Sequence, residues 1–162
     1  MDNSAGWIAH QAIYEYKAMQ EMSSFYPFLS FCSTIPHDSI LEIGSAYGGT
    51  LWAWTQIFNR VTSITLDGGD WGPLNPHGAS VIYGDCSDPA VISAVGNSYD
   101  MVFVDGDHDE TVRDVELYFP MTKIIAVHDI YTFSSAGWAE LTRRYDHMEF
   151  DGRMGIGLLF RR

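Results

Sequence analysis

Ile40-Leu-Glu-Ile-Gly-Ser-Ala-Tyr-Gly-Gly-Thr50 is the stretch of the sequence that decides the fold. It begins as a short apolar run with one embedded acid, continues through a turn of small residues and leads into the helix-like segment 50–58. Glycines in such a turn leave room for a ligand, and the free N–H groups of the following helix favour an electronegative one. The stretch therefore predicts a site for a nucleotide-like small molecule.

Short apolar runs recur along the chain and alternate with helix-like segments. The runs cover residues 40–43, 61–66, 80–83, 101–104 and 124–127, and helices are expected to start near Asp88-Pro89, near Asp109 and at Ser134 or Ser135. Two further runs, 145–150 and 155–160, flank the turn signal Asp151-Gly152 and predict a hairpin that adds an antiparallel strand at the end of the sheet. Together they predict an α/β, Rossmann-like, doubly wound and mostly parallel seven-stranded sheet, with helices on both faces.

Apolar residues in the N-terminal region follow a different spacing from those in the later strands. Apolar residues between positions 7 and 31 recur every three or four residues, which predicts one amphipathic helix ending at or just before Pro27. We expect it to cap the sheet, with a lid or a dimer contact as the alternative. The expected organisation is a single domain over 1–162, with 1–39 as a helical cap and 40–162 as the Rossmann-like core.

Composition limits the kinds of partner. The chain has 162 residues, a formal net charge of −12 and only nine Lys and Arg residues, which disfavours a nucleic-acid surface. No apolar run approaches the roughly 18 residues that a membrane span requires. Cys32 and Cys86 are too few for a disulfide framework. We expect a cytoplasmic protein with a small-molecule substrate, no nucleic-acid or membrane partner, and scope for a homo-oligomer.

The turn narrows the choice of ligand further. A dinucleotide site normally reads Gly-x-Gly-x-x-Gly, and the spacing after Gly44 departs from that pattern at Ala46. Glu42 is also unusual beside a pyrophosphate, whereas a carboxylate suits a ligand with an amine or a positive charge. A nicotinamide-dependent oxidoreductase is therefore disfavoured.

The segment Glu42-Ile-Gly-Ser-Ala-Tyr-Gly-Gly-Thr50 resembles motif I of the class I S-adenosylmethionine (SAM)-dependent methyltransferases. Its form is that of small O-methyltransferases grouped with the cephalosporin hydroxylase-like proteins, and it is similar, more distantly, to the catechol and caffeoyl-CoA enzymes. The resemblance covers about residues 40–130. It implies a SAM-dependent O-methyltransferase acting on a small hydroxylated acceptor.

The resemblance also assigns contacts to SAM. It places Asp67 at the ribose hydroxyls, Asp85 at the adenine amino group and Glu42 at the methionine ammonium. Asp67 can instead form a turn before Gly68-Gly69, and Asp85 can instead belong to a cap near Asp88-Pro89. The residues expected to bind the cofactor are Glu42, Gly44, Ser45, Tyr47, Gly48, Asp67, Gly68, Asp85, Cys86 and Asp105.

Two later strands end in acids and histidines. Asp105 follows the run 101–104, and His128-Asp129 follows the run 124–127. Charge at the end of an apolar strand is costly to bury without a function, and adjacent parallel strands would bring these termini together. The resemblance to metal-dependent O-methyltransferases implies Asp105, His128 and Asp129 as ligands of Mg²⁺ or Mn²⁺. Because relatives mostly carry a carboxylate or amide at the place of His128, either the imidazole binds too or only the two aspartates do.

His108 lies three residues after Asp105, where catechol-type relatives carry a lysine base. Histidine can accept a hydroxyl proton at neutral pH, so His108 and Asp105 are the expected catalytic residues. Three alternatives remain: a metal-independent enzyme with His108 as base, a non-catalytic SAM-binding or partner module, and a purely structural His128–Asp129 pair.

Overall fold

A seven-stranded sheet forms the centre of the computed structural model, which describes residues 4–66, 73–96 and 98–161. Its strands are β1 (Ser39–Ile43), β2 (Arg60–Thr65), β3 (Ser80–Tyr83), β4 (Met101–Val104), β5 (Ile124–His128), β6 (Asp146–Phe150) and β7 (Ile156–Phe160), in the spatial order β3-β2-β1-β4-β5-β7-β6. The first five pair in parallel, as the apolar runs predict. The order reverses between β1 and β4, which is where open α/β sheets bind ligands.

The C-terminal hairpin is confirmed, but its antiparallel strand does not form the edge. β7 pairs antiparallel with both β5 and β6, and β6 is the outer strand. Burial explains the order. Residues 156–159 of β7 are all buried, whereas residues 146–149 of β6 are exposed, so the more apolar strand takes the inner place.

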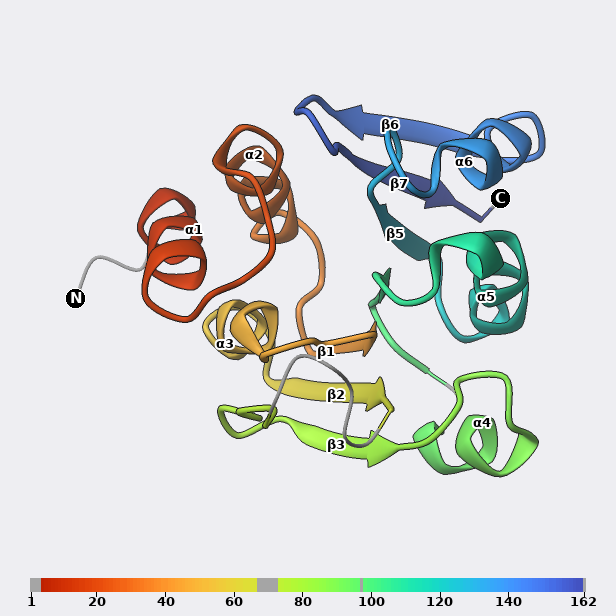
Figure 1. The fold of residues 1–162 in the computed structure, drawn as a ribbon, viewed down its shortest axis with the longest axis horizontal. Helices are drawn as coiled ribbons and strands as arrows, with labels where there is room; N and C mark the ends of the chain where they lie inside the picture. The colour runs from red at the N-terminus through yellow and green to blue at the C-terminus, as the bar shows by residue number, and fades with distance from the viewer. Residues whose placement is uncertain (1–3, 67–72, 97, 162) are drawn as a thin grey trace.

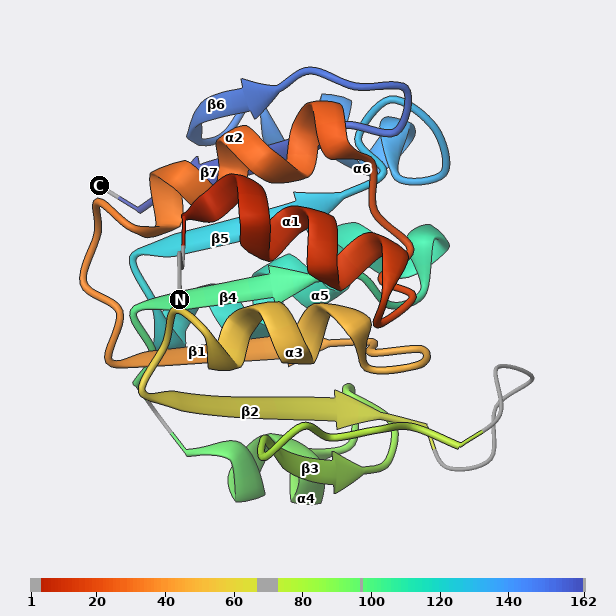
Figure 2. The same cartoon turned by 90° about the vertical axis from the view of Figure 1, so that its left-hand side faces the viewer.

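Three helices cover each face of the sheet (Figures 1 and 2). One face carries α1 (Ala5–Tyr14), α2 (Met22–Cys32) and α3 (Gly49–Thr55), and the other carries α4 (Pro89–Val95), α5 (Thr111–Tyr118) and α6 (Ser135–Leu141), with 3₁₀ turns at His108–Glu110 and Phe119–Met121. The Asp88 side chain caps α4, and Ser134 is the N-cap of α6, as predicted. The doubly wound fold class is thereby confirmed. None of the helices in the described residues is long and apolar enough to cross a membrane.

The single helix predicted over residues 7–31 is wrong, because two helices occupy this region. α1 ends at Tyr14, after which Lys17 takes a left-handed conformation with φ of 60° and the N–H of Ala18 donates to the carbonyl of Ala12. Pro27 lies inside α2 rather than at its end. It removes one helical hydrogen bond, but the burial of neighbouring Phe28 and Leu29 favours continuing the helix.

Candidate functional site

A cavity of about 710 Å³ lies at the carboxyl ends of the parallel strands. Its walls come from the turn after β1, the ends of β2, β3, β4 and β5, and the segment that joins α1 to α2. Among the residues predicted to form the site, Gly44, Ser45, Tyr47, Asp85, Cys86, Asp105, His108, His128 and Asp129 all line it. Asp67 and Gly68 lie outside the described residues.

The turn after β1 is shaped by two glycines in the left-handed region. Gly44 has φ of 85°, and a Cβ there would collide with the backbone carbonyl of Asp105. Gly48 has φ of 87°, and a Cβ there would collide with the carbonyl of Asn75. Ala46, which replaces the middle glycine of a dinucleotide turn, also has a positive φ, of 39°. The turn is therefore a tight backbone cradle that other side chains cannot enter without strain.

Glu42 supports this turn from inside the protein. Its side chain is fully buried, and it accepts hydrogen bonds from Ser45 Oγ at 2.6 Å and from Trp54 Nε1 at 3.1 Å. Burial raises the pKa of Glu42 to about 7, against the lowering effect of these hydrogen bonds. Glu42 does not line the cavity, so the structure brings Ser45 to the cavity wall and holds the Glu42 carboxylate behind it. Direct contact of Glu42 with a cofactor stays a prediction.

Asp85 and Cys86 form the wall beyond β3. Asp85 Oδ1 accepts hydrogen bonds from the backbone N–H and the hydroxyl of Ser87, both at 2.8 Å, which lowers the pKa of Asp85. No hydrogen bond of a described residue engages its other oxygen, which can therefore face a ligand or solvent. The Cys86 thiol lies 3.4 Å from Asp114, a buried acid on α5. The alternative role of Asp85, in the cap near Asp88-Pro89, is not what the structure shows, because Asp88 caps α4 while Asp85 holds Ser87 and lines the cavity.

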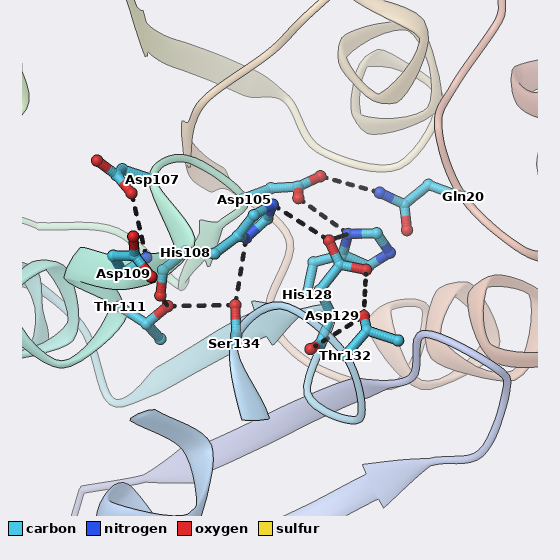
Figure 3. Close-up of polar contacts among 10 residues, drawn as sticks. All are labelled: Gln20, Asp105, Asp107, His108, Asp109, Thr111, His128, Asp129, Thr132 and Ser134. Carbon is cyan, nitrogen blue, oxygen red and sulfur yellow. Dashed lines mark hydrogen bonds and ion pairs between the residues drawn. The ribbon is translucent and has the colours of Figure 1, made fainter. Parts of the chain in front are cut away.

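The ends of β4 and β5 bring two carboxylates and one imidazole together (Figure 3). Nδ1 of His128 lies 2.9 Å from Asp105 Oδ1 and 3.3 Å from Asp129 Oδ2. The potential ligand atoms of these three residues all lie within 4.8 Å of one another. Two carboxylate oxygens and one imidazole nitrogen are donors that suit Mn²⁺, or Mg²⁺ if the carboxylates dominate. The cluster therefore fits a divalent cation.

Local strain and unpaired atoms also mark this cluster. Asp129 is not a glycine, yet its φ is 60°, a conformation that costs free energy and that Thr132 stabilises by donating to Asp129 Oδ1 at 3.2 Å. Burial alone would lower the pKa of His128, but the carboxylates of Asp105 and Asp129 outweigh it and raise the pKa to about 10. Nε2 of His128 is buried and has no hydrogen-bond partner among the described residues.

His108 stands beside this cluster on the 3₁₀ turn after β4. Its Nε2 lies 3.4 Å from Asp129 Oδ2, and its Nδ1 lies 3.3 Å from the hydroxyl of Ser134. Phe133 stacks on the imidazole with ring centroids 5.3 Å apart, and the Phe133 ring is largely exposed at the cavity. The ring of His108 is therefore held through both nitrogens and on one face.

Sequence reasoning missed the contribution of the segment between α1 and α2. Lys17, Ala18 and Met19 line the cavity, and Nε2 of Gln20 donates to Asp105 Oδ2 at 3.0 Å. Gln20 and Asp105 are 85 residues apart, so no spacing rule could connect them. No local signal distinguishes Gln20, because its neighbours Lys17, Glu21 and Ser23 are polar too.

Solved structures show which fold this arrangement belongs to. The chain is similar to an O-methyltransferase from Bacillus cereus in complex with S-adenosylhomocysteine (SAH), at 12% identity and a TM-score of 0.63 over 99% of this chain and 92% of that one. It is similar to a putative caffeoyl-CoA O-methyltransferase from Staphylococcus aureus, at 15% identity and a TM-score of 0.68 over 98% and 92%. The chain has the class I methyltransferase fold.

A larger protein with this methyltransferase fold carries a metal. MycE, a methyltransferase from the mycinamycin biosynthetic pathway in complex with Mg and SAH, matches at 13% identity and a TM-score of 0.71. The match covers 98% of this chain and 53% of MycE, so the chain spans about half of that protein's length. No protein-family model matches the sequence, and no curated protein matches it.

Proposed function

We propose that this protein is a SAM-dependent methyltransferase that transfers a methyl group to a hydroxyl oxygen of a small molecule with the help of a divalent cation. One observation carries the proposal: the glycine turn after β1 and the cluster of Asp105, His128 and Asp129 open into the same cavity. A methyl donor in the turn and an activated hydroxyl at the cluster would then be neighbours. The fold and the SAH-bound neighbours support this reading.

The cofactor would lie along the glycine turn. Gly44, Ser45 and Tyr47 line the wall there, Gly48 shapes the turn without lining the cavity, and Asp85 offers a carboxylate oxygen further along. When bound, SAM supplies an electrophilic methyl group. The chain's contribution is to orient it, since holding two reactants in line accounts for much of the rate of such a transfer.

Asp105, His128 and Asp129 would hold the cation, with Mg²⁺ and Mn²⁺ as the candidates. A bound divalent cation lowers the pKa of a hydroxyl at the site. Asp129 has a second role, because its Oδ2 also faces His108. This carboxylate can therefore stabilise the positive charge that His108 acquires when it accepts the hydroxyl proton.

A metal-independent methyltransferase is the second candidate. The close ion pair between His128 and Asp105 favours it, because an imidazolium between two carboxylates already neutralises part of their charge. In that case His108, paired with Asp129, would act as the base alone. Turnover that is insensitive to EDTA would select this candidate.

Residues 1–162 would act as one domain with 1–39 as a cap, in the cytoplasm, alone or as a homo-oligomer. The net charge of −12 argues against nucleic acid as the acceptor.

Thermal shift with SAH and with NAD⁺ tests the cofactor class. We expect SAH to raise the melting temperature and NAD⁺ to leave it unchanged, because Ala46 departs from the dinucleotide pattern. Methyl transfer from labelled SAM to a panel of hydroxylated acceptors, with Mg²⁺, Mn²⁺ or EDTA, then separates the two candidates. No shift with SAH would contradict both of them.

A further inference from the structure

The segment between α1 and α2, residues 15–21, is fixed against the cofactor turn. Gly49, the first residue of α3, packs so closely on this segment that a Cβ would collide with the backbone nitrogen of Ala18. The Tyr16 ring stacks on Trp52 of α3 with centroids 4.4 Å apart. Lys17, next to Tyr16, takes its left-handed conformation here. The segment is therefore an ordered part of the cavity wall, held in place by its packing on α3.

Gln20 connects this wall to the metal cluster. Its Nε2 donates to Asp105 Oδ2 at 3.0 Å, while Nδ1 of His128 lies 2.9 Å from Asp105 Oδ1. Figure 3 shows these two contacts as dashed lines that join Asp105 to Gln20 and to His128. Each oxygen of Asp105 thus contacts one partner, Oδ2 contacting Gln20 and Oδ1 contacting His128. Rotation of the carboxylate would break both contacts.

The other end of the Gln20 amide is not satisfied by the chain. Gln20 is 7% exposed, and its Oε1 is buried without a hydrogen-bond partner among the described residues. Turning the amide over would place this oxygen against the Asp105 carboxylate, which is repulsive. An apolar side chain of similar size would avoid the cost of burying an unpaired amide oxygen. Folding alone therefore does not account for a glutamine at this position.

We propose that Gln20 is a positioning residue of the metal site, which holds the Asp105 carboxylate in the orientation that faces His128 and Asp129. This inference rests on the cation of the proposed function. Hydrogen bonds to ligating carboxylates orient them, and removing such a partner typically weakens metal binding by about 10- to 100-fold. The segment 15–21 thereby contributes to cation binding without supplying a ligand.

Gln20→Met tests the inference, because methionine keeps the size of the side chain and removes the amide. Mn²⁺ affinity is measured by isothermal titration calorimetry with SAH present, and the melting temperature is measured in EDTA. We expect Q20M to weaken Mn²⁺ binding by about 10- to 100-fold and to melt at the wild-type temperature or above it. Gln56→Met at the C-cap of α3, outside the cavity, is the matched control and should bind Mn²⁺ as the wild type does.

The outcomes separate this inference from the proposed function. Wild-type Mn²⁺ affinity in a folded Q20M protein would overturn the role of Gln20 and leave the metal site standing. A lower melting temperature in EDTA with unchanged Mn²⁺ affinity would make Gln20 a structural residue. Failure of the wild type to bind Mn²⁺ would overturn both the metal site and this inference. If Q20M does not fold, Gln20→Leu also removes the amide, and the same changes in Mn²⁺ affinity and melting temperature are expected for it.

Discussion

Gly44 packs directly against the backbone carbonyl of Asp105, so that no side chain fits between the turn after β1 and the end of β4. The neighbouring backbone reinforces this contact, because the N–H of Asp105 donates to the carbonyl of Ile43 at 2.8 Å. The proposed cofactor cradle and the proposed metal cluster are therefore parts of one rigid unit. A substitution in the cradle should therefore alter the metal cluster, and a substitution in the cluster should alter the cradle.

Gly44→Ala should disrupt this unit. The added Cβ meets the Asp105 carbonyl and forces φ away from 85°, so we expect at least about 3 kcal/mol of destabilisation and loss of SAH binding. Urea unfolding and calorimetry with SAH measure both effects. Gly96→Ala is the matched control, since Gly96 has φ of 84° and open space around its Cα. The ψ of Gly96 is −166°, a region that other residues rarely adopt, so G96A should cost about 1–3 kcal/mol of backbone strain and leave SAH binding intact. If both variants lost the same stability and the same SAH affinity, the close packing of Gly44 on Asp105 would not be the cause of the loss.

Glu42 should make the stability of the protein depend on pH. Burial raises its pKa to about 7, so between its ordinary value and 7 the folded state holds a proton that the unfolded chain has released. The free energy of unfolding therefore falls as the pH rises through this range, by about 3 kcal/mol from this group. Glu42→Gln removes the titration; its one amide oxygen can accept from Trp54 Nε1, and its N–H₂ group can donate to the Ser45 hydroxyl.

The measurement for Glu42 is urea unfolding of the wild type and E42Q at pH 5 and pH 8. The advantage of E42Q over the wild type should be larger at pH 8 than at pH 5. A constant difference between the two proteins would show that Glu42 does not titrate in this range.

Asp129→Asn should remove a metal ligand with little change of shape. Asparagine tolerates the left-handed conformation that residue 129 requires, so the fold should persist. We expect Mn²⁺ affinity to fall at least about 100-fold, more than loss of an outer hydrogen bond would cause. Calorimetry with Mn²⁺ measures it. Asp109→Asn makes the same charge change at an exposed residue, and its Mn²⁺ affinity should stay near the wild-type value. Similar losses in both variants would point to a general electrostatic effect instead of ligation.

His108→Gln should separate chemistry from binding. The glutamine cannot accept the hydroxyl proton, so methyl transfer should slow by about 10²- to 10⁴-fold while SAH affinity is retained. Initial rates with labelled SAM and an active acceptor, together with SAH calorimetry, measure the two quantities. A rate close to that of the wild type would show that His108 is not the base.

Much of the fold was predictable because each parallel strand is a short apolar run that ends at a chemically distinct residue. The runs 80–83 and 101–104 match β3 and β4 in both bounds, and the acids and histidines at the ends of β4 and β5 meet as expected. Parallel pairing explains this success, since adjacent carboxyl ends share one edge of the sheet. The strand pattern therefore predicted that these ends meet, and the resemblance to metal-dependent O-methyltransferases selected Asp105, His128 and Asp129 among their residues.

The remaining features depend on contacts that no local pattern encodes. The break after α1 uses Lys17 in a conformation usually reserved for glycine, so the helical period continues through it without a signal. Gln20 reaches Asp105 across 85 residues, and Glu42 is drawn away from the cavity by Ser45 and Trp54. Tertiary packing determines the helix break at Lys17, the Gln20–Asp105 contact and the position of the Glu42 side chain.

A crystal structure with SAH and Mn²⁺, with anomalous data collected at the manganese edge, tests the proposed function most directly. We predict SAH along the turn from Gly44 to Gly48 and one anomalous peak within bonding distance of Asp105 and Asp129. SAH bound elsewhere, or an intact His128–Asp105 ion pair with no anomalous peak at saturating Mn²⁺, would contradict metal-assisted methyl transfer at this site.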